Sequence, residues 1–106
     1  MMPPPVANIA KFLSNDIRTI IEPLGEGFKQ TTNYKLTAPA RVYHYYRYNP
    51  NTDWMLVTFT NNKVLEGSTS VGPYLPDTRV FFRLVAKDDA DVITDTFESL
   101  FITPPK

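Results

Sequence analysis

Short segments that alternate between apolar and polar residues, separated by turn-forming residues, dominate the chain from Phe28 to Thr103. Alternation with a period of two is typical of a strand with one buried face. Turn signals such as Asn49-Pro50-Asn51-Thr52-Asp53 recur roughly every ten residues, a spacing that favours an antiparallel sandwich or barrel over a parallel sheet. We therefore expect a mostly β chain, an antiparallel β-sandwich of about six to seven strands. Six of these strands are expected at residues 28–37, 40–48, 54–60, 63–71, 79–87 and 94–103.

Length and composition favour one domain without covalent staples. The 106 residues, 42% of them hydrophobic, suffice for a single core. The absence of cysteine excludes disulfides, thiolate nucleophiles and cysteine-based metal sites. Eleven basic and eleven acidic residues leave no net charge, whereas nucleic-acid-binding domains usually carry a basic excess. No apolar run approaches the ~20 residues of a membrane span, and no secretory signal pattern opens the chain. We expect a protein made in the cytoplasm, with neither nucleic acid nor membrane as partner.

The first 24 residues differ in character from the rest, so we expect an N-terminal unit at 1–24 and the β-sandwich at 25–106. The prolines at positions 3–5 favour an extended polyproline arm, either free or laid on a neighbouring subunit. Apolar residues then recur at helical spacing over 6–24, which predicts one amphipathic helix that cannot continue past Pro23.

The same segment allows a second interpretation, because Ile17, Thr19 and Ile21 are β-branched and alternate as in a strand. We favour the helix, with its apolar side against the core or another chain. The residues of this unit expected to contact a partner are Pro3, Pro4, Pro5, Ile9, Leu13, Ile17 and Ile20.

The C-terminal part of the chain carries a family resemblance. Pro76-Asp77-Thr78 precede an aromatic strand that closes with Phe82-Arg83-Leu84-Val85-Ala86, and a short polar tip follows at 88–91. This text resembles the last third of a fibronectin type III or related immunoglobulin-like domain. Val80 stands where that family usually has a corner tyrosine, and Tyr74 where it has a leucine. The resemblance implies the sandwich architecture and no particular reaction.

The most unusual stretch of sequence is the expected strand at 40–48, in which arginines and tyrosines are interleaved. Alternation places Arg41, Tyr43, Tyr45 and Arg47 on one face. Tyrosine and arginine are enriched at the hot spots of protein interfaces, and they also stack on bases and sugars. The alternative is a structural face whose tyrosines cover the core and point their hydroxyls to water. We expect these four residues to contact a partner protein.

No catalytic or metal-binding pattern is present. His44 is the single histidine and is expected to be a packed or partly exposed side chain that could still titrate near neutral pH. Asp88, Asp89, Asp91 and Asp95 form an acidic tip that lacks the spacing of a helix-flanked calcium loop, so a solvated turn is the expectation and calcium the alternative. The serines lie in no nucleophile motif. We expect no enzyme, no cofactor and no metal.

These features favour a non-catalytic structural or adaptor protein of a larger assembly, in contact with protein subunits of the same or a neighbouring kind. Such a chain would be a homo-oligomer or part of a hetero-assembly, located in a virion or a cytoplasmic assembly. A head, tail or decoration component of a virus or phage particle suits the architecture by analogy. The alternative is a freestanding fibronectin-like binding module that recognises a protein or a glycan.

Overall fold

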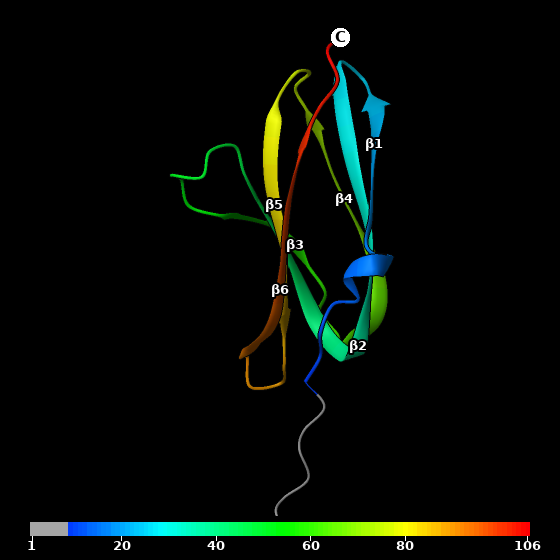
Figure 1. Ribbon diagram of the computed structural model, residues 1–106, viewed down its shortest axis with the longest axis vertical. Helices are drawn as coiled ribbons and strands as arrows, with labels where there is room; N and C mark the ends of the chain where they lie inside the picture. Colours follow the sequence, from blue (N-terminus) through cyan, green and yellow to red (C-terminus); the bar gives the residue numbers. More distant parts are fainter. Residues whose placement is uncertain (1–8) are drawn as a thin grey trace, which may run out of the picture.

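Six antiparallel strands make up the fold in the computed structural model, which describes residues 9–106 (Figure 1). The expectation of a mostly β, antiparallel chain is confirmed, and no α-helix occurs among the described residues. A 3-10 turn, η1, precedes the first strand. The elements are η1 (Ser14–Asp16), β1 (Arg18–Leu24), β2 (Gly27–Arg47), β3 (Met55–Phe59), β4 (Val64–Tyr74), β5 (Arg79–Lys87) and β6 (Ile93–Ile102).

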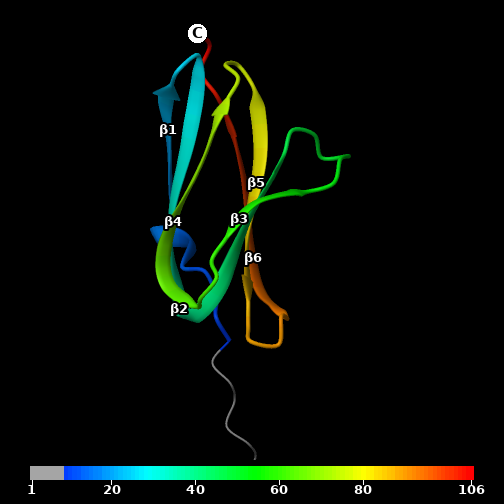
Figure 2. The ribbon, with the colours of Figure 1, turned by 180° about the vertical axis from the view of Figure 1, so that it is seen from behind.

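The long strand β2 belongs to both layers of the fold. Its first half pairs with β1 and β4, and we call these the first layer. From Arg41 onward it pairs with β3 and β5, and β6 pairs with β5 to complete the second layer. Figures 1 and 2 show β2 turning from one layer into the other at the end of the molecule opposite the C-terminus. The two layers thus share one continuous strand.

The expected division of this region into strands 28–37 and 40–48 is wrong, because β2 is unbroken. Pro39 lies where β2 changes layers: regular pairing with β4 ends at Lys35, resumes at Ala40, and pairing with β5 begins at Arg41. Proline has no N–H to give to a ladder, so it is tolerated where pairing lapses. Here it marks a bend within a strand.

The prediction of an amphipathic helix is also wrong, and the first half of the segment is extended instead. Residues 10–13 are extended along β2, where the Leu13 N–H donates to the Lys35 carbonyl at 2.9 Å and Phe12 forms an isolated bridge with Leu36. Ala10 and Phe12 are buried, whereas Lys11 between them is exposed. The segment therefore has the period of a strand, and it contributes side chains to the same core as β2.

The second half of the expected helix is the strand β1, which pairs with β2 from Arg18 to Leu24. Pro23 does not end this element but lies within it, as an edge strand permits. β-Branched residues favour the strand where a partner strand is available. Of the residues expected to contact a partner, Ile17 packs partly against the core, while Ile9, Leu13 and Ile20 are exposed. Pro3, Pro4 and Pro5 lie outside the described residues.

The core between the layers has an apolar end and an aromatic–polar end. Phe12, Leu36, Val42 and Leu84 belong to the apolar cluster. The other end holds edge-to-face aromatic pairs that centre on Tyr74, which contacts the rings of Tyr46, Tyr48 and Phe101. Such geometry aligns ring edges with ring faces and adds to the free energy of burial. Several polar side chains are buried nearby: Gln30, Thr32, His44, Thr69 and Thr103.

Thr103 fastens the end of the chain to the turn between β4 and β5. Its hydroxyl donates to the Leu75 carbonyl at 2.6 Å and accepts from the Thr78 N–H at 2.8 Å. The Thr103 N–H donates to the Thr78 carbonyl at 2.9 Å. Because the side chain is fully buried, these bonds are shielded from water. They fix the start of β5, and with it the register of the second layer.

Candidate partner-binding face

The outward side of the second layer carries the four residues that alternation along the strand predicts to share one face: Arg41, Tyr43, Tyr45 and Arg47. Val42 and His44 are buried toward the core, whereas Arg41, Tyr43 and Tyr45 are half-exposed on the opposite side. Arg47 continues this side at the end of β2. The alternation thus places the arginines and tyrosines together, as expected for a half-buried strand.

Strand β5 adds two more cations beside these tyrosines. Arg83 lies opposite Tyr45 and Lys87 opposite Arg41 in the β2–β5 register, and directly opposite residues share one side of a sheet. The Arg83 guanidinium lies 5.0 Å from the centre of the Tyr45 ring. The Lys87 ammonium lies 4.5 Å from that of Tyr43. Both distances fall within the range of cation–π attraction.

A bulge in β3 brings Trp54 and Phe59 to the same side. Tyr43 pairs with Phe59 and Tyr45 with Leu56, which leaves Val57 without a partner on β2. An unpaired residue reverses the sides that the following side chains take. Phe59 therefore stacks on Tyr43 with ring centres 5.4 Å apart, and Trp54 reaches the arginines on the same side.

The Trp54 ring lies close to two guanidinium groups. The Arg47 guanidinium lies 4.0 Å from the centre of its ring, and that of Arg83 lies 4.9 Å away. Tryptophan is the best aromatic partner for a cation. We name the whole surface the cation–aromatic face; its members are Arg41, Tyr43, Tyr45, Arg47, Trp54, Phe59, Arg83 and Lys87.

The cations of this face differ in how fully they are paired. Arg41 donates to the Tyr43 hydroxyl, the Asp88 carbonyl and the Asp91 carboxylate, at 2.9–3.1 Å. Lys87 also reaches Asp91, at 3.8 Å. These contacts tie β2, just after its bend, to the β5–β6 turn, so the cation–aromatic face is anchored at that end.

A cleft of about 320 Å³ opens at the other end of the cation–aromatic face. Its lining combines side chains from the end of β2, from the residue before β3 and from the β5–β6 pair: Arg47, Trp54, Phe81, Glu98, Ser99 and Leu100. Leu100 is 51% exposed, so the cleft offers apolar surface to solvent. Aromatic, apolar and guanidinium groups around one recess are the usual components of a recognition site.

His44 lies behind the face, inside the core, and is not exposed at all. Its Nδ1 lies 2.8 Å from the Thr69 hydroxyl, its ring meets Phe82 edge-to-face, and its Nε2 has no protein partner. Burial lowers the pKa of His44 from 6.5 to about 4, because the charged imidazolium is poorly solvated there. Burial likewise raises the pKa of Tyr74 above its ordinary range, an effect that its tyrosine neighbours reinforce. His44 is thus a packed side chain, one of the two settings expected from the sequence, and its lowered pKa contradicts the expectation that it could titrate near neutral pH.

The acidic tip directs its carboxylates to separate partners. Asp88 accepts from the Ala90 and Val92 N–H groups, and Asp95 accepts from the Phe12 N–H at 2.8 Å. Asp89 pairs with Lys63, and Asp91 pairs with Arg41 and Lys87. Within residues 9–106, no group of three or more histidine or acidic side chains lies together as metal ligands would.

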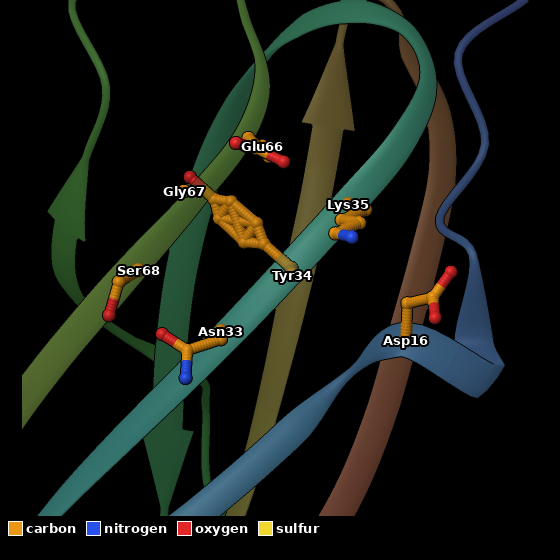
Figure 3. Close-up of a pocket in the computed structure, with 7 residues that line it drawn as sticks. All are labelled: Asp16, Asn33, Tyr34, Lys35, Glu66, Gly67 and Ser68. Carbon is orange, nitrogen blue, oxygen red and sulfur yellow. The ribbon is translucent and has the colours of Figure 1, made fainter.

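A second hollow, of about 410 Å³, lies on the first layer (Figure 3). Figure 3 shows the Tyr34 ring reaching from β2 to Gly67 on β4, with Asp16 apart on η1. A Cβ on Gly67 would stand 2.5 Å from the Tyr34 hydroxyl oxygen, so this ring occupies the place of a side chain. The rest of the lining is polar: Asn33, Lys35, Glu66 and Ser68. Compared with this hollow, the cation–aromatic face has far more of the side chains that recognise partners.

Comparison with known proteins finds no matching family model, curated protein or solved structure. In the described part of the chain, no helix has the length and apolar character to cross a membrane.

Sequence reasoning identified the β2 residues of the cation–aromatic face and missed the others. Arg83 and Lys87 could have been found, because they alternate with the buried residues of β5 as the tyrosines do on β2. Trp54 and Phe59 could not. Simple alternation along residues 54–60 assigns them to opposite sides, and only the bulge at Val57 unites them.

Proposed function

We propose that this chain is a non-catalytic structural or adaptor subunit of a larger protein assembly and that it docks a neighbouring subunit on the cation–aromatic face. The kind of assembly proposed is a virus or phage particle, with the chain as a head, tail or decoration component. The observation that carries the proposal is the cation–aromatic face, in which arginine, lysine and aromatic side chains from β2, β3 and β5 are stacked on an open sheet surface.

The composition of the face supports docking of a protein. Interface hot spots are enriched in tryptophan, tyrosine and arginine. Arg83 contacts both Trp54 and Tyr45 here, and exposed Phe59 and Leu56 extend the apolar surface at the β3 edge. Stacking already fixes these long side chains in the free protein, so little rotamer entropy remains to be lost on binding.

The stacking also ranks the two functions considered for the sequence. A glycan-binding module presents the open faces of aromatic rings to sugars. Here the Trp54 ring lies beside Arg47 and Arg83, and the Tyr43 ring beside Phe59 and Lys87. Rings engaged in this way favour a protein neighbour, which contacts guanidinium groups and ring edges.

The test is site-specific photo-crosslinking in the cells that make the protein. A photoreactive phenylalanine analogue replaces Tyr45 at the centre of the face. In a matched control it replaces Ser70, an exposed residue of β4 in the first layer. We expect a discrete crosslinked protein, another copy or a neighbour, from position 45 and none from position 70. Crosslinks of equal yield from both positions, or none from position 45, contradict the proposal.

A further inference from the structure

The two arginines beside Trp54 leave most of their N–H donors without an acceptor among the described residues. A guanidinium offers five N–H donors. Arg47 gives one bond, from Nη1 to the Thr52 carbonyl at 3.2 Å. The Arg83 Nη1 lies 3.9 Å from the Glu98 carboxylate, beyond hydrogen-bond distance. Among residues 9–106, the Nε atoms of both arginines are buried and have no hydrogen-bond partner. By comparison, the Arg41 guanidinium on the same strand donates hydrogen bonds to three acceptors.

These two guanidiniums share one indole ring and therefore concentrate positive charge at one place. Glu98 is the only carboxylate in the lining of the adjoining cleft, and its side chain is 56% exposed. A solvated carboxylate at 3.9 Å neutralises two guanidiniums poorly. The cleft therefore attracts a further negative group.

The rest of the cleft limits what can carry that negative group. Phe81 and Leu100 supply apolar surface beside Arg47. A ligand that fills the cleft thus combines a carboxylate with an adjacent apolar group. Nucleic-acid binding needs several cationic contacts to phosphates and, for single strands, open rings for base stacking; the chain has no net positive charge, and Trp54 and Tyr43 already have cations or a ring beside them.

We propose that this cleft is a carboxylate-binding site for an acidic side chain of the partner protein, with an apolar residue of the same partner segment packed on Leu100. This inference rests on the proposed docking function and names the chemistry of the docked segment. Arg47, in the lining of the cleft, and Arg83, which lies outside that lining but beside Trp54 and Glu98, bind the carboxylate through their terminal N–H groups, and Trp54 holds both guanidiniums in place. Charge-assisted bonds of this kind are roughly twice as strong as neutral ones.

Trp54 provides the assay, because it is the only tryptophan in the chain and lines the cleft. Its fluorescence is recorded while the full-length protein is titrated with acetyl-Leu-Glu-Leu-amide or with the uncharged acetyl-Leu-Gln-Leu-amide. We expect saturable binding of the glutamate peptide, and binding of the glutamine peptide weaker by about tenfold or more.

Single substitutions separate the roles of the charged groups. Arg47→Gln and Arg83→Gln should each weaken binding of the glutamate peptide by about tenfold. Glu98→Gln removes the carboxylate already in the cleft lining and should strengthen binding of the glutamate peptide. Arg18→Gln, an exposed arginine of β1 in the first layer, is the matched control and should leave binding unchanged. Backbone circular dichroism of each variant checks that the fold is intact.

Three results overturn the inference: no response to the glutamate peptide, equal affinity for both peptides, or tighter binding of a short oligodeoxythymidine strand or of maltohexaose. The crosslinking experiment keeps the two proposals apart. If position 45 crosslinks a neighbour but the peptides bind equally, the docking face stands and the carboxylate site fails. If position 45 gives no crosslink, the docking function fails, whatever the peptides do.

Discussion

Acid should destabilise this protein through its single histidine, and the size of the effect follows from the burial of His44. In the folded chain the pKa of His44 is about 4, whereas the pKa of an unfolded histidine is 6.5. Between these pH values the unfolded chain binds a proton that the folded chain rejects. The free energy of unfolding is therefore unaffected by His44 above about pH 6.5, and it falls as the pH drops toward 4. Below pH 4 both states are protonated and the effect no longer grows.

The interval of roughly 2.5 pH units, at about 1.36 kcal/mol each, gives a loss of about 3 kcal/mol between pH 7 and pH 4. Proteins of this size are stable by only about 5–15 kcal/mol, so the loss is large. Within residues 9–106 no ion pair to His44 offsets it, and the interactions of its ring are with the Thr69 hydroxyl and the Phe82 ring.

Urea unfolding at pH 7, 6, 5 and 4, on the natural chain and on His44→Gln, measures this loss. Glutamine retains a polar group for the Thr69 hydroxyl and does not titrate. Carboxylates that titrate in the same range contribute equally to both proteins, so the difference between the two curves isolates His44. We expect that difference to change by about 3 kcal/mol in favour of the variant from pH 7 to pH 4.

Two results refute the reasoning. The first is a pair of parallel stability curves for the natural chain and His44→Gln. The second is a histidine NMR resonance, unambiguous because the chain has one histidine, that titrates near pH 6.5 in the folded protein.

Two substitutions test the parts of the fold that hold the layers together. Phe12→Ala should lower the free energy of unfolding by about 3 kcal/mol, because it opens a cavity in the core. Leu13→Ala, at an exposed position, should lower it by under about 1 kcal/mol. If urea denaturation gives the reverse order, the extended path of residues 10–13 is contradicted. Thr103→Val should lower the free energy of unfolding by about 2 kcal/mol, because it leaves the part-buried Thr78 N–H and Leu75 carbonyl without the Thr103 hydroxyl. Thr103→Ser, which keeps the hydroxyl, should lower it less in the same assay. Equal losses of stability would show that the methyl group matters more than the hydrogen bonds.

Much of the β structure could be predicted from the sequence because alternation is a local signal. The strand expected at 79–87 coincides with β5, and the strand expected at 94–103 differs from β6 by one residue at each end. The N-terminal segment could not be predicted in this way. Its apolar residues fit a helical stripe, but the stripe omits Phe12, which is buried in the core. The segment is extended because Phe12 forms a bridge with Leu36 and β1 pairs with β2. Both pairings involve residues that are not sequence neighbours.

The sequence by itself determines which residues of β2 share a side, since a strand has a period of two wherever it lies. It therefore places Arg41, Tyr43, Tyr45 and Arg47 together, and it places His44 on the opposite side. Only the tertiary structure decides which strands lie beside β2. The β5 register brings Arg83 to Tyr45, and the bulge at Val57 turns Trp54 onto the same side. The physical reason is that alternation depends on local backbone geometry, whereas pairing and bulges depend on contacts that exist only after the chain has folded.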